Sequence, residues 1–218
     1  MRRSTPIRAD APDLKAAIRA RYDAFSGRYN RVLAPMEWLG MGRVRRALLA
    51  HARGEVLEVA VGTGINLQCY PPGCRLHAVD FSPAMLERAR AQAARLGRTV
   101  DLRLMDAEQL DYPPARFDTV VSTLSTCTFP NPVRAMAEMR RVVRPDGQVL
   151  LIEQGLSDRP WVRQLQAWQA ERQFRWLGCR WLREPHQQAQ AAGLRPLEDR
   201  RLVLGMIHVL RLAPGPVS

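Results

Sequence analysis

The chain has 218 residues, with 33 basic and 21 acidic side chains and a formal net charge of +12. An apolar content of 46% is enough for a buried core and excludes a disordered or collagen-like chain. The sequence has no run of about 18 apolar residues that would predict a membrane-spanning helix, and no apolar stretch of a secretory signal follows the basic N-terminus.

The charge is distributed unevenly. Residues 1–53 carry +8, residues 54–158 carry −2 and residues 159–201 carry +5. A basic surplus is typical of proteins that meet nucleic acid or anionic membranes, but here it lies in two flanks around a nearly neutral middle. We therefore expect the flanks 1–53 and 159–201 to face the binding partner, either a small molecule or an anionic membrane surface. Nucleic acid is the less favoured partner.

The cysteines give no sign of a metal site or a disulfide framework. Cys69, Cys74, Cys127 and Cys179 have no paired spacing and no nearby histidine. We expect no bound metal, and reduced thiols favour a cytoplasmic protein. We interpret Cys127, which follows a predicted strand, as a packed thiol.

Two helical stretches are predicted within the first 51 residues. Apolar residues recur at steps of four and three over 13–33, as in an amphipathic helix, with Gly27 as an expected interruption. A second helical stretch is expected from about Met36 to His51.

In the rest of the chain, the spacing of apolar residues alternates between the pattern of strands and the pattern of helices. Short apolar runs predict five strands, at 55–60, 75–80, 99–104, 117–122 and 148–153. Between them we expect helices that begin near Ile65 and at Pro83, a helix over 132–143, and a turn at 145–147. Strands that alternate with helices predict a parallel sheet with helices on both faces. Further helices are expected at 160–177 and 184–192, and the runs 194–199 and 202–212 predict an antiparallel hairpin.

A candidate ligand site follows the first strand. Gly62 and Gly64 allow close approach of a ligand to the backbone, and ligands of open α/β sheets bind at the carboxyl ends of the strands. Glu58, Asp80 and Asp106 lie at or just after the ends of three successive predicted strands. Leu67 stands where a dinucleotide site prefers its third glycine, so a cofactor with a positively charged part is favoured over a pyrophosphate.

These motifs resemble those of the class I S-adenosylmethionine-dependent methyltransferases over nearly the whole chain. The resemblance is carried by VLEVAVGTG, AVDFSPAML, LMDAEQL and FDTVVSTLSTCTFPNP, followed by MRRVVRPDGQVLLIE. It implies a Rossmann-like α/β fold with a seven-stranded sheet and an N-terminal cap helix. We expect one compact unit, with 1–53 as the helical cap and 54–218 as the S-adenosylmethionine-binding domain.

The resemblance also implies the residues that hold S-adenosylmethionine. Glu58 would lie near the amino group of its methionine part, Asp80 would bind the ribose and Asp106 the adenine amino group. The other expected contacts are Tyr22, Tyr29, Ala60, Gly62, Gly64, Phe81, Met85, Ala107 and Ser122. Ala60 replaces the first glycine of the family's motif. No general base is identified; Glu153, at the end of the fifth strand, is interpreted as an anchor for the loops above it.

The acceptor is expected to be hydrophobic or amphipathic. YDAFSGRYN and VGTGINL resemble bacterial phospholipid and quinone methyltransferases, so a phospholipid amine of the phosphatidylethanolamine type or a quinone precursor at the inner membrane surface is favoured. A resemblance to the membrane-associated alkyl-thiol methyltransferases makes a small thiol the alternative. An RNA methyltransferase and a non-catalytic, cofactor-binding regulator remain further alternatives. Tryptophans and arginines interleave at 160–183, which is typical of a pocket wall or a membrane-interface helix.

Overall fold

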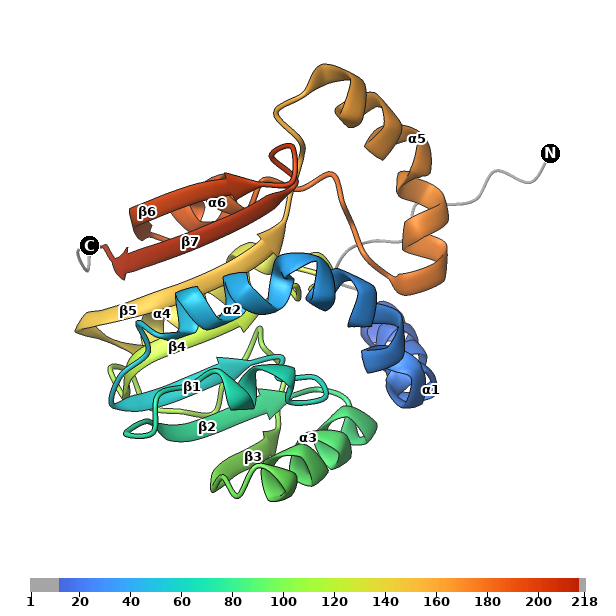
Figure 1. Ribbon diagram of the computed structural model, residues 1–218. Coiled ribbons are helices and arrows are strands. Elements are labelled where there is room, and N and C mark those ends of the chain that lie inside the picture. Colours follow the sequence, from blue (N-terminus) through green and yellow to red (C-terminus); the bar gives the residue numbers. More distant parts are fainter. Residues whose placement is uncertain (1–11, 216–218) are drawn as a thin grey trace.

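The computed structural model describes residues 12–215, and its centre is a seven-stranded sheet with the order β3-β2-β1-β4-β5-β7-β6 (Figure 1). The strands are β1 Glu55–Val59, β2 Arg75–Asp80, β3 Val100–Leu104, β4 Phe117–Thr123, β5 Val143–Gln154, β6 Leu194–Leu202 and β7 Ile207–Pro214. The first five are parallel, and β7 pairs antiparallel with both β5 and β6. The predicted fold class and the final hairpin are confirmed. Residues 1–11 of the predicted cap and 216–218 lie outside the described range.

The helices cover both faces of this sheet. They are α1 Pro12–Met36, η1 Glu37–Met41, α2 Gly42–Leu49, η2 Ile65–Gln68, α3 Pro83–Arg95, α4 Pro132–Val142, α5 Pro160–Leu177 and α6 Pro185–Ala191. In Figure 1, α2 and α3 lie in front of the sheet and α4 and α6 behind it. One apolar core lies on each side: Leu49, Leu67 and Leu86 belong to the front core, and Met136 and Met139 to the rear core.

Three local predictions were wrong. Gly27 does not interrupt α1, which runs unbroken from Pro12 to Met36. A glycine costs a helix only about 1 kcal/mol, which is too little to break one of this length. The expected helix at Ile65 is one 3₁₀ turn, η2, because Pro71 and Pro72 follow closely and cannot continue it. The expected helix 36–51 is two elements: the π-helical η1, with its bend at Gly40, precedes α2.

The predicted turn at 145–147 is also revised. Strand β5 already begins at Val143, so this segment lies within the strand. The pairing with β4 changes register between Phe117 and Thr119, which accommodates the irregularity. The pairing of β4 with β5 is then regular as far as Ile152, so Glu153 lies at the carboxyl edge of the sheet.

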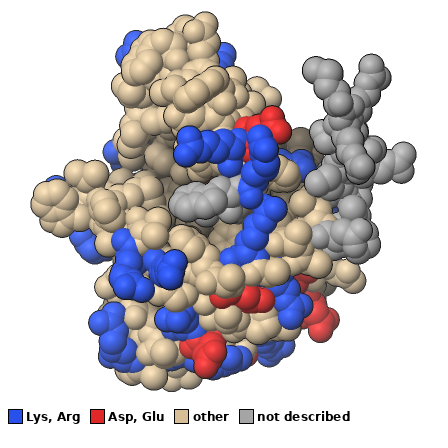
Figure 2. Space-filling view, turned by 90° about the vertical axis from the view of Figure 1, so that its right-hand side faces the viewer, with Lys and Arg blue, Asp and Glu red and all other residues tan. Residues whose placement is uncertain are grey.

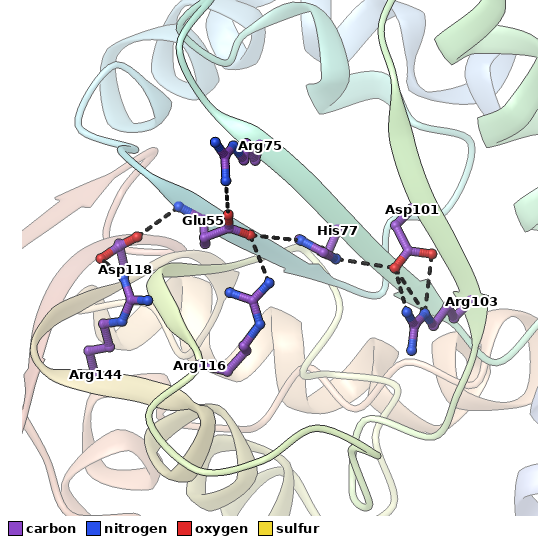
Figure 3. Close-up of polar contacts among 8 residues, drawn as sticks. All are labelled: Glu55, Arg75, His77, Asp101, Arg103, Arg116, Asp118 and Arg144. Atoms are coloured by element: carbon purple, nitrogen blue, oxygen red, sulfur yellow. Dashed lines mark hydrogen bonds and ion pairs between the residues drawn. The ribbon is translucent and has the colours of Figure 1, made fainter.

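A charged network joins the opposite, amino-terminal edge of the strands (Figure 3). Glu55 on β1 accepts from Arg75 at 3.1 Å, from His77 at 3.0 Å and from Arg116 at 3.0 Å. His77 also contacts Asp101 on β3 at 3.2 Å. The network therefore links β1, β2 and β3 in register at the edge remote from the predicted ligand site. Arg103, Asp118 and Arg144 extend it sideways.

Candidate functional site

The turn after β1 has a backbone suited to close approach by a ligand. Ala60, Gly62 and Gly64 have φ values of 58°, 55° and 78°. No described atom lies within 4 Å of the place where a Cβ on Gly62 would stand, so the turn is open on that side. Ala60 holds a conformation that costs a non-glycine residue about 1–2 kcal/mol. The strain is consistent with a loop shaped for binding.

Asp80 is the central carboxylate of the site. It ends β2, is 5% exposed, and accepts from the amides of Gly62 at 2.8 Å and Ser82 at 2.9 Å. Burial raises the pKa of Asp80 to about 6, although these backbone hydrogen bonds lower it. A carboxylate has about four acceptor positions. After the two amides are served, Asp80 can still accept hydroxyl groups from a ligand.

A pocket opens beside Asp80, at the carboxyl ends of β1, β2 and β3. Of the predicted contacts, it brings together Ala60, Asp80, Phe81, Asp106 and Ala107. Its empty space, open mouth included, is about 410 Å³. The remaining lining residues are Lys15, Ile18, Val79, Met105, Glu108, Thr128, Phe129 and Pro130. Apolar walls next to a carboxylate suit a planar base joined to a sugar with hydroxyl groups, so the lining is chemically suited to the adenosine part of S-adenosylmethionine.

Asp106 is shared with a lysine that the sequence analysis did not identify. Lys15 on α1 lies 2.5 Å from Asp106 Oδ2 and 2.7 Å from Glu108 Oε2. Asp106 Oδ1 accepts from the Glu108 amide at 2.9 Å. Lys15 therefore closes the end of the pocket at Asp106 and competes for the carboxylate that the sequence analysis predicts to bind the adenine amino group.

Helix α1 crosses the mouth of the site and is fixed at two further points. The Thr63 hydroxyl donates to Asn30 at 2.6 Å, and the Ser82 hydroxyl donates to Asp23 at 2.5 Å. With Lys15, these contacts attach α1 to the loops that follow β1, β2 and β3. In this arrangement α1 acts as a lid over the cofactor pocket, and we call it the cap helix.

The two predicted tyrosines lie on the cap helix. The rings of Tyr22 and Tyr29 are 6.4 Å apart, and Phe25 packs edge-on against Tyr29. Burial raises the pKa of both tyrosines, so both hydroxyls stay protonated donors. Tyr22 hydrogen-bonds Cys179, and the charge of Asp80 acts on Tyr29. Both side chains thus face the interior of the site, while their contact with a cofactor remains a prediction.

Glu58 belongs to a buried polar network around the turn after β1. It accepts from Asn66 Nδ2 at 2.7 Å and from the Tyr70 hydroxyl at 2.8 Å. Burial raises the pKa of Glu58 to about 7, against the lowering effect of these hydrogen bonds and of Arg45. Arg45 donates to Asn66 Oδ1 at 3.0 Å and to Thr123 at 2.7 Å. Glu58 does not line the pocket, so its predicted contact with the methionine amino group remains untested.

The ends of β4 and β5 carry Ser122 and Glu153, and neither residue lines the pocket. Ser122 is fully buried and hydrogen-bonds Ser125. Glu153 accepts from the amides of Ser125 and Thr126, each at 3.1 Å, and burial raises its pKa to about 7. Its contacts are those of the loop anchor that the sequence analysis favoured.

Gly64 and Met85 do not line the pocket. A Cβ on Gly64 would stand 2.9 Å from the Leu67 side chain and 3.2 Å from the Ala89 backbone, so this glycine allows the turn to pack closely on α3. Met85 is fully buried on α3. Within the described part of the chain, no three His, Cys, Asp or Glu side chains are grouped to hold a metal ion.

Comparisons with known proteins agree with this geometry. Residues 57–151 match the family described as "Methyltransferase domain". The chain is 40% identical over 120 residues to a phosphatidylethanolamine N-methyltransferase of Cereibacter sphaeroides, covering 53% of this chain and 59% of that protein. It is 37% identical over 149 residues to a demethylmenaquinone methyltransferase of Deinococcus radiodurans, covering 65% and 58%.

Two further similarities are informative. Human thiol S-methyltransferase TMT1B is 30% identical over 133 residues, covering 56% of this chain and 54% of that protein. The crystal structure of a SAM-dependent methyltransferase from Thermotoga maritima superposes with a TM-score of 0.67 at 20% identity, covering 89% of this chain and 99% of that one. The chain thus spans somewhat over half the length of these three curated relatives, and the structural match establishes the fold.

Proposed function

We propose that the protein transfers a methyl group from S-adenosylmethionine to a hydrophobic or amphipathic acceptor at a membrane surface. The proposal starts from the match of residues 57–151 to the methyltransferase domain family. The favoured acceptors are a phospholipid amine of the phosphatidylethanolamine type and a quinone precursor. Two of the relatives described above act, by their names, on such molecules.

The chain's own residues have a limited task in this reaction. When bound, the cofactor supplies a methyl group already activated by a positively charged sulfur, so the protein mainly has to align donor and acceptor. Asp80 and the turn at Gly62 would hold the sugar, and the apolar pocket walls would hold the base. The cap helix would exclude water from the pocket. No residue has to act as a base unless the acceptor arrives protonated.

Helix α5 is the observation that favours a membrane-held acceptor. Its inward face carries the buried Val162 and Gln166, and Gln166 accepts from the Ser157 amide at 2.9 Å. Its outward face exposes Trp161 by 63%, Leu165 by 46% and Trp168 by 76%. A helix that buries a glutamine and exposes two tryptophans is poorly suited to water but well suited to a lipid interface.

Charge and position support the same surface. Arg159, Arg172 and Arg175 are exposed on α5, and anionic lipid gains about 1 kcal/mol per nearby arginine. α5 stands off from the sheet (Figure 1), and basic side chains gather along the hollow below it (Figure 2). The segment after α5 reaches the pocket rim, where Arg183 donates to the Phe129 carbonyl at 2.8 Å. No described helix is long and apolar enough to cross a bilayer, so contact through α5 would be peripheral.

The test is methyl transfer with labelled cofactor to three acceptors: phosphatidylethanolamine in anionic vesicles, a demethylated quinone in the same vesicles, and a small alkyl thiol in solution. We expect transfer to one of the vesicle-held acceptors. Transfer to the thiol alone would establish the alternative suggested by TMT1B. Cofactor binding without transfer to any of them would favour a non-catalytic regulator.

A variant separates the membrane surface from the chemistry. Trp161→Ala with Trp168→Ala should lower activity on vesicle-held acceptor about tenfold or more, with cofactor affinity unchanged, because 1.4 kcal/mol of lost interfacial binding is a factor of ten. Leu197→Ala is the matched control, since Leu197 is 55% exposed but lies on the edge strand β6. Equal activity of both variants on vesicles would remove α5 from the proposal.

A further inference from the structure

Two cysteines far apart in the sequence meet behind the pocket. The sulfur atoms of Cys127 and Cys179 are 3.0 Å apart, and both are reduced. Cys127 lies in the loop after β4 and Cys179 directly after α5, and their side chains are 2% and 8% exposed. Neighbouring residues of Cys127, Thr128 and Phe129, line the pocket. The pair is therefore next to the cofactor site but outside the contacts assigned to it.

The same two segments are already docked on each other. The Arg180 amide donates to the Cys127 carbonyl at 2.9 Å, and Arg183 donates to the carbonyls of Thr126 and Phe129. The backbones are thus held in place, and the two sulfurs need to move only about 1 Å closer to reach the bond length of a disulfide, about 2.05 Å.

The surroundings assign different roles to the two thiols. The Cys127 and Cys179 sulfurs share a hydrogen bond in which either can be the donor. This contact and the Tyr22 hydroxyl lower the pKa of Cys179 although burial opposes them, and the contact and burial raise the pKa of Cys127. The attacking species in thiol oxidation is a thiolate, and a second thiol beside it resolves the product. Cys179 is also the more exposed of the two, at 8% against 2%, so it is assigned the attacking role and Cys127 the resolving one.

We propose that Cys127 and Cys179 form a redox-active pair that hydrogen peroxide converts to a disulfide, which ties residues 178–183 to the loop at 125–129 beside the cofactor pocket. The Cys179 thiolate attacks one peroxide oxygen, the O–O bond breaks, and hydroxide leaves with the electron pair. The resulting sulfenic acid is attacked by the Cys127 sulfur, an S–S bond forms, and water leaves. Overall, two thiols and one peroxide give one disulfide and two waters, and a small thiol reverses the change.

The cap helix controls access to the pair. Tyr22 of α1 hydrogen-bonds Cys179, and Ile18 lies 3.3 Å from the place where a Cβ on Gly178 would stand. Arg21 donates to the Phe174 carbonyl at 3.1 Å. α1 thus covers the pair on one side, so a ligand that holds α1 closed over the pocket should slow oxidation. This inference depends on the pocket and the cap but not on which acceptor is methylated.

The experiment uses the full chain, treated with hydrogen peroxide and then alkylated and digested without reductant. We expect a mass loss of two hydrogen atoms and a crosslinked peptide that contains Cys127 and Cys179, both reversed by dithiothreitol. Cys179→Ser should abolish the crosslinked peptide. The matched control, Cys69→Ser with Cys74→Ser, should form it at the wild-type rate, because both of those thiols lie outside this cluster. Peroxide that yields only sulfinic acid, or a crosslink through Cys69 or Cys74, would overturn the proposal.

A second measurement tests the role of the cap. Addition of S-adenosylhomocysteine before peroxide should slow formation of the crosslink several-fold, and an unchanged rate would overturn the account of access. Because the wild-type chain carries both measurements, the result does not depend on the folding of any cysteine variant. A wild-type protein that methylates its acceptor but forms no Cys127–Cys179 crosslink with peroxide would overturn the redox pair. That result would leave the proposed function intact.

Discussion

The Asp80 side chain contacts the backbone of the turn after β1 and also lines the pocket. Its two oxygens fix the amides of Gly62 and Ser82, and its remaining acceptor positions face the pocket. One side chain therefore shapes the loop and also presents a negative group to a ligand. Removal of this carboxylate should weaken cofactor binding, and it also leaves the amides of Gly62 and of the buried Ser82 without their acceptor.

Asp80→Ala should weaken S-adenosylmethionine binding by about 1–3 kcal/mol, which is the cost of leaving polar partners unpaired. Isothermal titration calorimetry measures the change. Asp111→Ala, which removes an exposed carboxylate in the loop before β4, serves as the control and should bind as the wild type does. An Asp80 variant with the affinity of that control would remove Asp80 from the site.

Glu153 predicts a dependence of stability on pH. In the unfolded chain a glutamate titrates near pH 4.3, whereas burial in the folded protein raises the pKa of Glu153 to about 7. A raised pKa in the folded state gives stability that is fully present below the unfolded value and is lost as pH rises through about 7. The free energy of unfolding should therefore fall over this interval.

Glu153→Gln should flatten this fall, since glutamine does not titrate. Thermal unfolding of the cofactor-free protein at several values between about pH 5 and pH 8 measures it. Glu58, whose pKa is also raised to about 7, should account for part of the slope that remains. Glu87→Gln, on the exposed face of α3, is the control. Parallel curves for wild type and Glu153→Gln would show that this carboxyl does not titrate as described.

The site residues divide by how far apart their partners are in the sequence. Asp80, Phe81, Asp106 and Ala107 could be predicted because each follows a strand within a short motif. Lys15 could not, because its partner Asp106 is 91 residues away and a lone lysine on a helix is typical of a solvated face. The meeting of Cys127 and Cys179 escaped prediction for the same reason, since only the docking of the segment after α5 brings them together.

At the scale of elements, the cap helix is held by polar bridges and by buried apolar side chains. Lys15, Asp23 and Asn30 each bridge to a different loop, and each bridge is partly open to solvent. Only the Lys15 bridge is an ion pair, and an exposed ion pair contributes about 0–1 kcal/mol. Leu14 and Ile18 add buried apolar contacts, so opening of the cap requires loss of these contacts as well as of the bridges.

Lys15→Ala should make the cap open more often. Loss of about 1 kcal/mol raises the open fraction up to about fivefold, and hydrogen exchange of the amides in residues 12–36 should speed up accordingly. Arg19→Ala is the control, because Arg19 pairs at 3.9 Å with Asp23 on the same helix and not with a loop. Unchanged exchange in the lysine variant would mean that other contacts hold the cap.

Periodicity predicted the elements well where a strand or helix is long and its sequence pattern is uniform. The five parallel strands and the final hairpin are of this kind. The error at Ile65 arose because a glycine-rich turn is typical of the start of a helix. Pro71 and Pro72 follow so closely that the helix ends after a few residues. The kink between α1 and α2 is at Gly40, which has a φ of 133°, and the sequence carries little other signal for it.

At the scale of the whole molecule, the basic surplus and the chemistry lie in different places. The nearly neutral middle of the chain forms the five parallel strands and most of the pocket, whereas α5 and the cap helix belong to the basic flanks. The favoured reading of the flanks as acceptor-facing follows from composition alone. Which side chains they would present, with Trp161 and Trp168 outward and Gln166 inward, could not be predicted, because the sequence favoured a pocket wall for the four tryptophans of 160–183 over a membrane contact.

The network around Glu55 and His77 has a consequence for protein engineering. All of its members lie between Glu55 and Arg144, at the edge of the sheet opposite the pocket. None lies within 156–193, the segment that carries α5, Cys179 and α6. A graft that exchanges 156–193 for the equivalent segment of a relative with another acceptor would thus leave every bond of this network intact. The framework and the part of the chain that would select the acceptor are separable, so chimeras are a direct way to transplant specificity.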